Sequence, residues 1–71
     1  MYPNPATNFV DIEYTFYNNL PEEISIFSSQ GVCVKSIRVT KQLGKVRINL
    51  NLPGGIYYVK SVNYCNKLIV L

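Results

Sequence analysis

Histidine and tryptophan are absent from the sequence, and charged residues make up only 15% of its 71 positions. The missing histidine excludes the side chain that most often acts as a general base near neutral pH. It also excludes the imidazole ligands of most zinc sites, and the spacing of Cys33 and Cys65 does not suit a metal-binding pair. We therefore expect no metal, no cofactor and no catalytic site in this chain.

The two cysteines favour a structural interpretation. Cys33 stands in an apolar run and is predicted to be a small buried side chain, whereas Cys65 stands in the polar segment Asn63–Asn66 and is predicted to be a turn thiol. We favour two free thiols, and a disulfide between them is the alternative. A mass measured without reductant distinguishes the two.

Acidic residues are few and lie in the first third of the chain, while every basic residue lies from Lys35 onward, for a net charge of +3. The bases are spread singly along the sequence, whereas tracking a phosphate backbone needs a contiguous basic face. We therefore expect no nucleic-acid partner. The separation of the two signs instead gives a long-range field that orients the domain on a partner and that salt weakens.

Long apolar runs are missing as well. No stretch approaches the ~18 apolar residues of a membrane helix, and the N-terminus lacks the basic start and apolar stretch of a signal peptide. Met1 is followed at once by Tyr2–Pro5, which is typical of a linker, so we expect the natural chain to extend upstream. The length allows one domain. We predict a linker and short N-terminal segment over residues 1–7 and a folded domain over residues 8–71.

Apolar residues, by contrast, are abundant at 48% and follow a period of two. In Phe9–Tyr17 they alternate cleanly with polar residues, which is the mark of a half-buried strand. Similar patterns recur at intervals of about 8–12 residues, and helical periodicity is nearly absent. The predicted strands cover Phe9–Tyr17, Glu22–Ser28, Val32–Val39, Val46–Asn51, Ile56–Val62 and Lys67–Leu71.

Glycine, proline and asparagine mark the connections between these strands. Gly31 supplies the positive φ that a tight hairpin requires. The alternation changes phase within the third strand, which predicts a β-bulge near Lys35 and Ser36. The predicted connections are a hairpin turn at Ser28–Gly31, a loop over Thr40–Lys45, a corner at Leu52–Gly55 and a turn over Asn63–Asn66.

Strands that are apolar on one face bury those faces when two sheets pack against each other. We therefore predict an all-β, immunoglobulin-like antiparallel β-sandwich of six strands, or seven with a short N-terminal piece. The corner before Tyr57 supports this fold, because such sandwiches often place a tyrosine just after a turn and bond its hydroxyl to nearby backbone. An ordinary core aromatic is the alternative for Tyr57.

Groups that could carry out catalysis are poorly supplied. Asp11 and Glu13 lie two residues apart, ~7 Å by strand geometry, on a predicted solvated face that offers no cleft to activate a carboxyl group. Ser28 and Ser29 have no base partner, and Pro53–Gly55 lacks the lysine and the helix of a phosphate loop. Exposed tyrosines give a carbohydrate-binding patch as an alternative, and those predicted to be exposed are Tyr2, Tyr17, Tyr58 and Tyr64.

Several short segments, taken in order, resemble one family. Tyr2–Thr7 leads into the first strand, and Ile24–Phe27 is followed by Gly31. Leu52–Tyr57 forms a leucine-to-tyrosine corner, and Lys67–Val70 forms a final lysine-led strand. Their order and spacing resemble the C-terminal sorting domain of the type IX secretion system over residues 2–71. Many members finish on a basic residue, whereas the last residue here is leucine.

The resemblance implies a non-catalytic targeting domain that directs an upstream cargo protein across the outer membrane of Bacteroidota. It also implies an immunoglobulin-type sandwich, recognition by the type IX translocon, removal by a sortase-like peptidase, and a final location at the cell surface or outside the cell. The residues that match the family's motif, and that we predict to be recognised, are Pro3, Asn4, Pro5, Gly31, Gly55, Tyr57, Lys67, Leu68, Ile69 and Val70.

Two structural hypotheses concern the ends of the chain. Because Pro3 and Pro5 fix φ and lack amide donors, Tyr2–Pro5 is predicted to be an extended spacer, or alternatively the start of the first strand. If Lys67–Leu71 is an edge strand, its free backbone groups can pair with a translocon strand or with a second copy, giving a homodimer by strand exchange. The simpler alternative is that this strand completes the core.

Two alternative functions stay open beside the targeting domain. The chain is then an appended carbohydrate- or protein-binding module of a surface enzyme, or a structural spacer domain.

Overall fold

The computed structural model describes residues 1–15, 22–41, 43–61 and 64–71. These residues form strands joined by short connections and contain no helix, so none of them forms a helix that could span a membrane. The strands are β1 (Phe9–Thr15), β2 (Glu22–Ser28), β3 (Cys33–Val39), β4 (Leu43–Asn49), β5 (Gly55–Ser61) and β6 (Tyr64–Val70).

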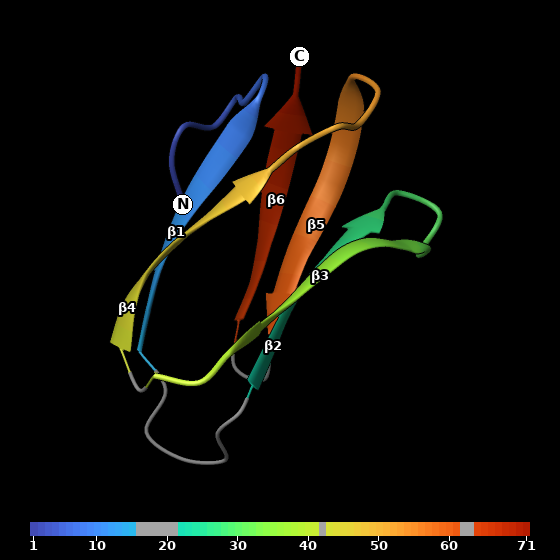
Figure 1. Cartoon of the computed structure of the whole chain (residues 1–71). Coiled ribbons are helices and arrows are strands. Elements are labelled where there is room, and N and C mark those ends of the chain that lie inside the picture. The colour runs from blue at the N-terminus through green and yellow to red at the C-terminus, as the bar shows by residue number, and fades with distance from the viewer. Residues whose placement is uncertain (16–21, 42, 62–63) are drawn as a thin grey trace.

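The strands are arranged in two antiparallel sheets, one of β1 and β4 and the other in the order β3-β2-β5-β6 (Figure 1). Each sheet places alternate side chains on its inner face, where they meet those of the other sheet. The predicted all-β, immunoglobulin-like sandwich is therefore confirmed. In the four-stranded sheet, β3 and β6 form the two edges.

The core is formed by alternate residues of both sheets. Val10 and Ile12 of β1, together with Ile26, Val59 and Leu68 of the larger sheet, are almost completely shielded from solvent. Burying a side chain of this size contributes roughly 1.5–3 kcal/mol. The period of two seen in Phe9–Tyr17 and Glu22–Ser28 therefore identified the inward positions correctly, as far as Thr15 in the first strand. Residues 16 and 17 lie outside the described residues.

The turn between β2 and β3 confirms the predicted hairpin. The amide of Gly31 donates to the carbonyl of Ser28 at 2.9 Å, and Gly31 has a φ of 87°. Residues that carry a side chain rarely adopt this backbone conformation, which explains the glycine at this position.

The predicted β-bulge exists, but it lies slightly earlier in the chain. Phe27 is opposite Cys33 and Ile26 is opposite Lys35, so Val34 is the extra residue. Because β3 is an edge strand, the bulge leaves Cys33 exposed, which corrects the prediction that this thiol is buried. Cys65 is exposed too, and neither sulfur is bonded to the other.

Two segments predicted as connections belong to strands instead. The predicted loop over Thr40–Lys45 is wrong at its end, because Leu43–Lys45 pairs with Glu13–Thr15. The predicted turn over Asn63–Asn66 is wrong from Tyr64 onward, because Tyr64–Asn66 pairs with residues 59–61. Both stretches are polar, but backbone pairing with the neighbouring strand outweighs their weak strand propensity. Residues 42, 62 and 63 lie outside the described residues.

Candidate recognition site

The last strand, β6, carries the motif residues Lys67–Val70 at the edge of the larger sheet. Leu68 and Val70 point into the core, with 0% and 3% of their surface exposed, whereas Lys67 and Ile69 point to solvent. This alternation follows directly from strand geometry. Of these four side chains in the folded domain, a partner can therefore contact only Lys67 and Ile69 directly.

The segment Tyr2–Ala6, here called the strap, connects the free edges of both sheets. Tyr2 exchanges two backbone hydrogen bonds with Asp11 of β1, at 2.9 and 2.6 Å. At its other end, the Ala6 amide donates to the carbonyl of Ile69, and the Leu71 amide donates to the carbonyl of Ala6, both at 2.8 Å. The Tyr2-Pro3 and Asn4-Pro5 peptide bonds are both cis. The strap therefore closes one side of the sandwich, beside β1 and β6 (Figure 1).

The side chain of Asn4 attaches the centre of the strap to β6. Its Nδ2 donates to the carbonyl of Lys67 at 2.9 Å, and its Oδ1 accepts from the amide of Ile69 at 3.0 Å. A carboxamide presents a donor and an acceptor on the same side, as the N–H and C=O of one strand residue do, so it can take the place of one residue of a neighbouring strand. Pro3 and Pro5, which lack an amide donor, stand on either side of it.

These contacts bear on both hypotheses about the chain ends. The predicted extended spacer is wrong, because the strap bends at residues 3–5 and lies against the sandwich through Tyr2, Asn4 and Ala6. The predicted edge position of β6 is correct, but its edge is not free: the strap occupies backbone groups of Lys67, Ile69 and Leu71. A partner strand can pair there only after displacing the strap.

The corner before β5 packs against the end of β6. An added Cβ at Gly54 would lie 3.2 Å from the carbonyl carbon of Leu71 and 3.3 Å from the carbonyl oxygen of Val70. A larger residue at position 54 would therefore require the end of the chain to shift by a few tenths of an ångström. The Tyr57 hydroxyl donates to the carbonyl of Pro53 at 2.7 Å, and its ring is buried. The predicted tyrosine corner is thus present.

We expect Tyr57→Phe to lower the free energy of unfolding by about 1 kcal/mol, the net value of one such hydrogen bond. The ring stays in place, so the core loses no volume. Chemical denaturation of the two proteins measures the difference. A variant as stable as the parent would show that the corner is held by packing alone.

The predicted recognition residues therefore fall into two places. Gly55 lies opposite Val70 and Tyr57 lies opposite Leu68. The strap lies along the other edge of β6, away from β5. Gly31 lies apart, in the turn that leads to the opposite edge of the sheet. The residues that the structure brings together at β6 are Pro3, Asn4, Pro5, Gly55, Tyr57, Lys67, Leu68, Ile69 and Val70.

A comparison with known protein families identifies the family of this chain. The family described as the secretion system C-terminal sorting domain matches residues 1–70. The chain belongs to this family. No curated protein and no solved structure matched it. The sorting domain is a signal of the type IX secretion system, and it directs export through the outer membrane to the cell surface or the medium.

The smaller sheet of the sorting domain carries a close ion pair on its outer face. Arg47 donates from Nε to Oδ1 of Asp11 at 2.8 Å and from Nη2 to Oδ2 at 3.1 Å, and its guanidinium lies 3.9 Å from the centre of the Phe9 ring. The prediction that Asp11 is solvated is wrong: it is 9% exposed, because Arg47 covers it, while Glu13 is exposed as predicted. The hydrogen bond from Arg47 lowers the pKa of Asp11 below its usual range.

This lowered pKa gives the sorting domain a defined acid response. A carboxylate whose pKa is lower in the folded state stabilises the fold above its unfolded pKa of about 3.9, and that contribution is lost as the pH falls through the folded pKa. We expect Asp11→Asn to be less stable than the parent at neutral pH and the difference to shrink below about pH 4. Urea unfolding across this range, with Glu13→Gln as control, measures it. A difference independent of pH would contradict the assignment.

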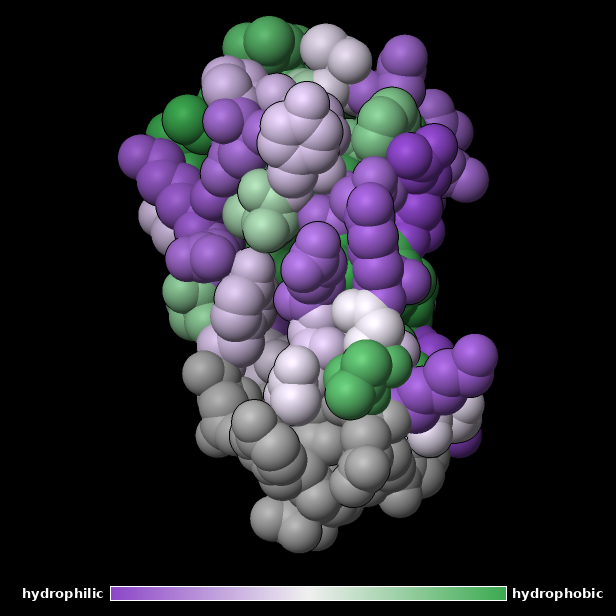
Figure 2. All heavy atoms as spheres, turned by 90° about the vertical axis from the view of Figure 1, so that its left-hand side faces the viewer, coloured by the Kyte–Doolittle hydropathy of each residue, from purple (hydrophilic) through white to green (hydrophobic). Residues whose placement is uncertain are grey.

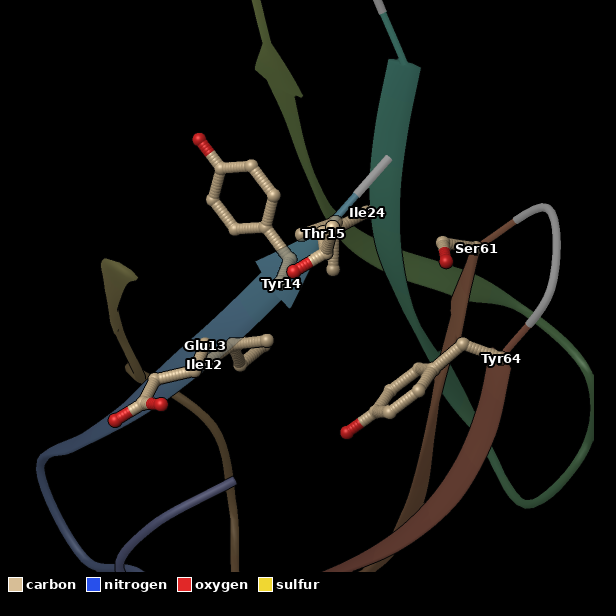
Figure 3. Close-up of a pocket in the computed structure, with 7 residues that line it drawn as sticks. All are labelled: Ile12, Glu13, Tyr14, Thr15, Ile24, Ser61 and Tyr64. Carbon is tan, nitrogen blue, oxygen red and sulfur yellow. The ribbon is translucent and has the colours of Figure 1, made fainter. Parts of the chain in front are cut away.

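A hollow of about 180 Å³ opens between the sheets at the end away from the strap, lined among others by Ile12, Ile24 and Tyr64. Tyr64 projects from β6 toward β1, whereas Glu13 and Tyr14 point away (Figure 3). Among the described residues of its lining, Glu13 supplies the one carboxylate. Within the described part of the chain, no cluster of side chains suits a metal ion.

Proposed function

We propose that the sorting domain is a folded, non-catalytic label, carried by an upstream cargo protein, that the translocon reads and a sortase-like peptidase removes. The observation that supports this most strongly is the hydrogen bonding between the two ends of the chain. Asn4 and Ala6 bond to Lys67, Ile69 and Leu71 across more than sixty positions of sequence. Motif residues that are far apart in the chain therefore form one surface only in the folded domain.

The chemistry of the described residues supports a role without catalysis. Asp11, the buried carboxylate, is already paired with Arg47. Among the described residues that line the hollow between the sheets, Glu13 is the one carboxylate and its side chain points away, so these residues offer no acid–base pair. Removal of the domain is therefore assigned to a separate peptidase.

The carbohydrate-binding alternative gains no support from the placement of the tyrosines. Tyr2 lies in the strap, Tyr58 lies on the outer face of the larger sheet, and Tyr64 lines the hollow. These three tyrosines lie in separate places, so they do not form a common stacking surface for a sugar. Tyr17, also predicted to be exposed, lies outside the described residues.

A homodimer by exchange of β6 remains a prediction. Exchange would transfer Tyr64–Val70 to a second copy, which would then provide the pairs that β5 and the strap provide in one chain. The sizes of the isolated chain at low and high concentration test it, since an exchanged dimer would persist on dilution.

Fusion of residues 1–71 to a periplasmic reporter tests the proposed function. In a host with the type IX system we expect the reporter at the cell surface or in the medium, and in a matched strain without the system we expect it in the periplasm. A reporter that stays in the periplasm of both strains would overturn the proposal.

A further inference from the structure

Part of the outer face of the larger sheet, on β5 and the adjoining parts of β2 and β6, is apolar where a solvated face is expected to be polar. On β5, Ile56 and Tyr58 point outward and are 44% and 36% exposed, and on β6 Ile69 is 37% exposed. Ile56 lies opposite Ile69, and Tyr58 lies beside the half-buried Phe27 of β2. These four side chains, here called the outer patch, form a contiguous surface across three strands.

The inner face of the same strands is apolar too, through Tyr57, Val59, Leu68 and Val70. Strands that are apolar on both faces are typical of sheets covered on both sides. The outer face of the smaller sheet shows the contrast, since it carries the opposed charges Asp11–Arg47 and Glu13–Lys45. The side of the molecule where β1 and β4 lie is mainly hydrophilic, with isolated hydrophobic side chains (Figure 2).

Two lysines border the outer patch. Lys67 lies opposite Tyr58, and the Lys60 ammonium lies 5.3 Å from the centre of the Phe27 ring. No salt bridge of either lysine is found within the described ranges. A groove of about 410 Å³ runs from Tyr58 and Lys60 to Gly31 in the β2–β3 turn. The patch thus joins the exposed motif residues Lys67 and Ile69 to Gly31, which lies apart from the strap.

We propose that the outer patch is the docking surface for a protein of the export machinery that presents an apolar area bordered by carboxylates. This inference rests on the proposed function and names the side chains that are read. Charge argues for this occupant rather than a second copy, because packing two outer patches together would bring Lys60 and Lys67 of both copies close to one another. Apolar contact supplies the affinity, and the lysines supply orientation and register.

The reporter fusion, with two pairs of variants, tests this surface. Ile56→Thr with Ile69→Thr removes apolar area but keeps β-branched residues, which suit strands. Its control, Val32→Thr with Leu43→Thr, changes exposed apolar residues elsewhere. Lys60→Glu with Lys67→Glu reverses charge on the patch, and Lys35→Glu with Lys41→Glu makes the same change in charge away from it. Circular dichroism and thermal unfolding establish that each variant is folded.

We expect both patch variants to reduce export by about tenfold or more, and both controls to export within about twofold of the parent. Normal export of both folded patch variants would overturn the docking surface and leave the proposed function intact. Failure of the parent fusion would overturn the proposed function and this inference with it. In sedimentation of the isolated chain, a dimer that Ile56→Thr with Ile69→Thr dissociates would make a second copy the occupant and contradict the proposal.

Discussion

Replacing Leu68 by alanine is expected to lower the free energy of unfolding of the sorting domain by about 2–5 kcal/mol. Leu68 is fully buried and lies opposite Tyr57 in the larger sheet, so the truncation leaves a cavity between the two sheets. A domain of 71 residues is stabilised by only about 4–10 kcal/mol in total. Much of the protein should therefore unfold at moderate temperature, and a melting curve or urea titration measures the loss.

Lys67→Ala is the matched control, because it changes the neighbouring motif residue on the opposite face of β6. Its side chain is exposed, so we expect a change in stability within about 0.5 kcal/mol. If Leu68→Ala proved as stable as Lys67→Ala, the burial of Leu68 between the sheets would be wrong. The pair thus separates motif residues that build the fold from those that a partner can touch.

Truncation of Asn4 to alanine is expected to lower the free energy of unfolding by about 1–3 kcal/mol. It removes two hydrogen bonds to β6, each with a net value of about 0.5–1.5 kcal/mol. The amide of Ile69 loses its partner, so its hydrogen exchange should accelerate, while the amides within β2 should change little. Chemical denaturation and site-resolved exchange measure the two effects.

Asn4→Asp is the corresponding control for the strap. A carboxylate still accepts from the Ile69 amide but cannot donate to the Lys67 carbonyl, so we expect a loss of stability that includes this second bond while exchange at Ile69 stays slow. Unchanged stability and unchanged exchange at Ile69 in Asn4→Ala would show that the strap does not hold β6.

Local pattern predicted the larger part of the fold for a physical reason. Strands such as β1 and β2 turn every second side chain toward the core, so Val10, Ile12, Ile24 and Ile26 could be placed from the sequence alone. Pattern failed at Leu43–Lys45, where polar and glycine residues look like a loop and only the register with β1 makes them a strand.

The site was less predictable because its contacts are long-range. The motif singled out Asn4 and Lys67, but nothing local indicates that the amide of one bonds to the carbonyl of the other. The role of Ala6 was missed for the same reason, since its partners are Ile69 and Leu71. A usable signal did exist for the outer patch: Ile56–Val59 is apolar on both strand faces, which a half-solvated strand does not require.

The most direct test of the central claim, that the joined chain ends form the export label, is reporter export by Asn4→Ala compared with Tyr57→Phe. Asn4→Ala removes two hydrogen bonds and Tyr57→Phe removes one, but only Asn4→Ala disturbs the contact between the strap and β6. With the folded fraction measured for each variant, we expect a clear loss of export for Asn4→Ala and near-parental export for Tyr57→Phe. Equal export by the two variants would contradict it.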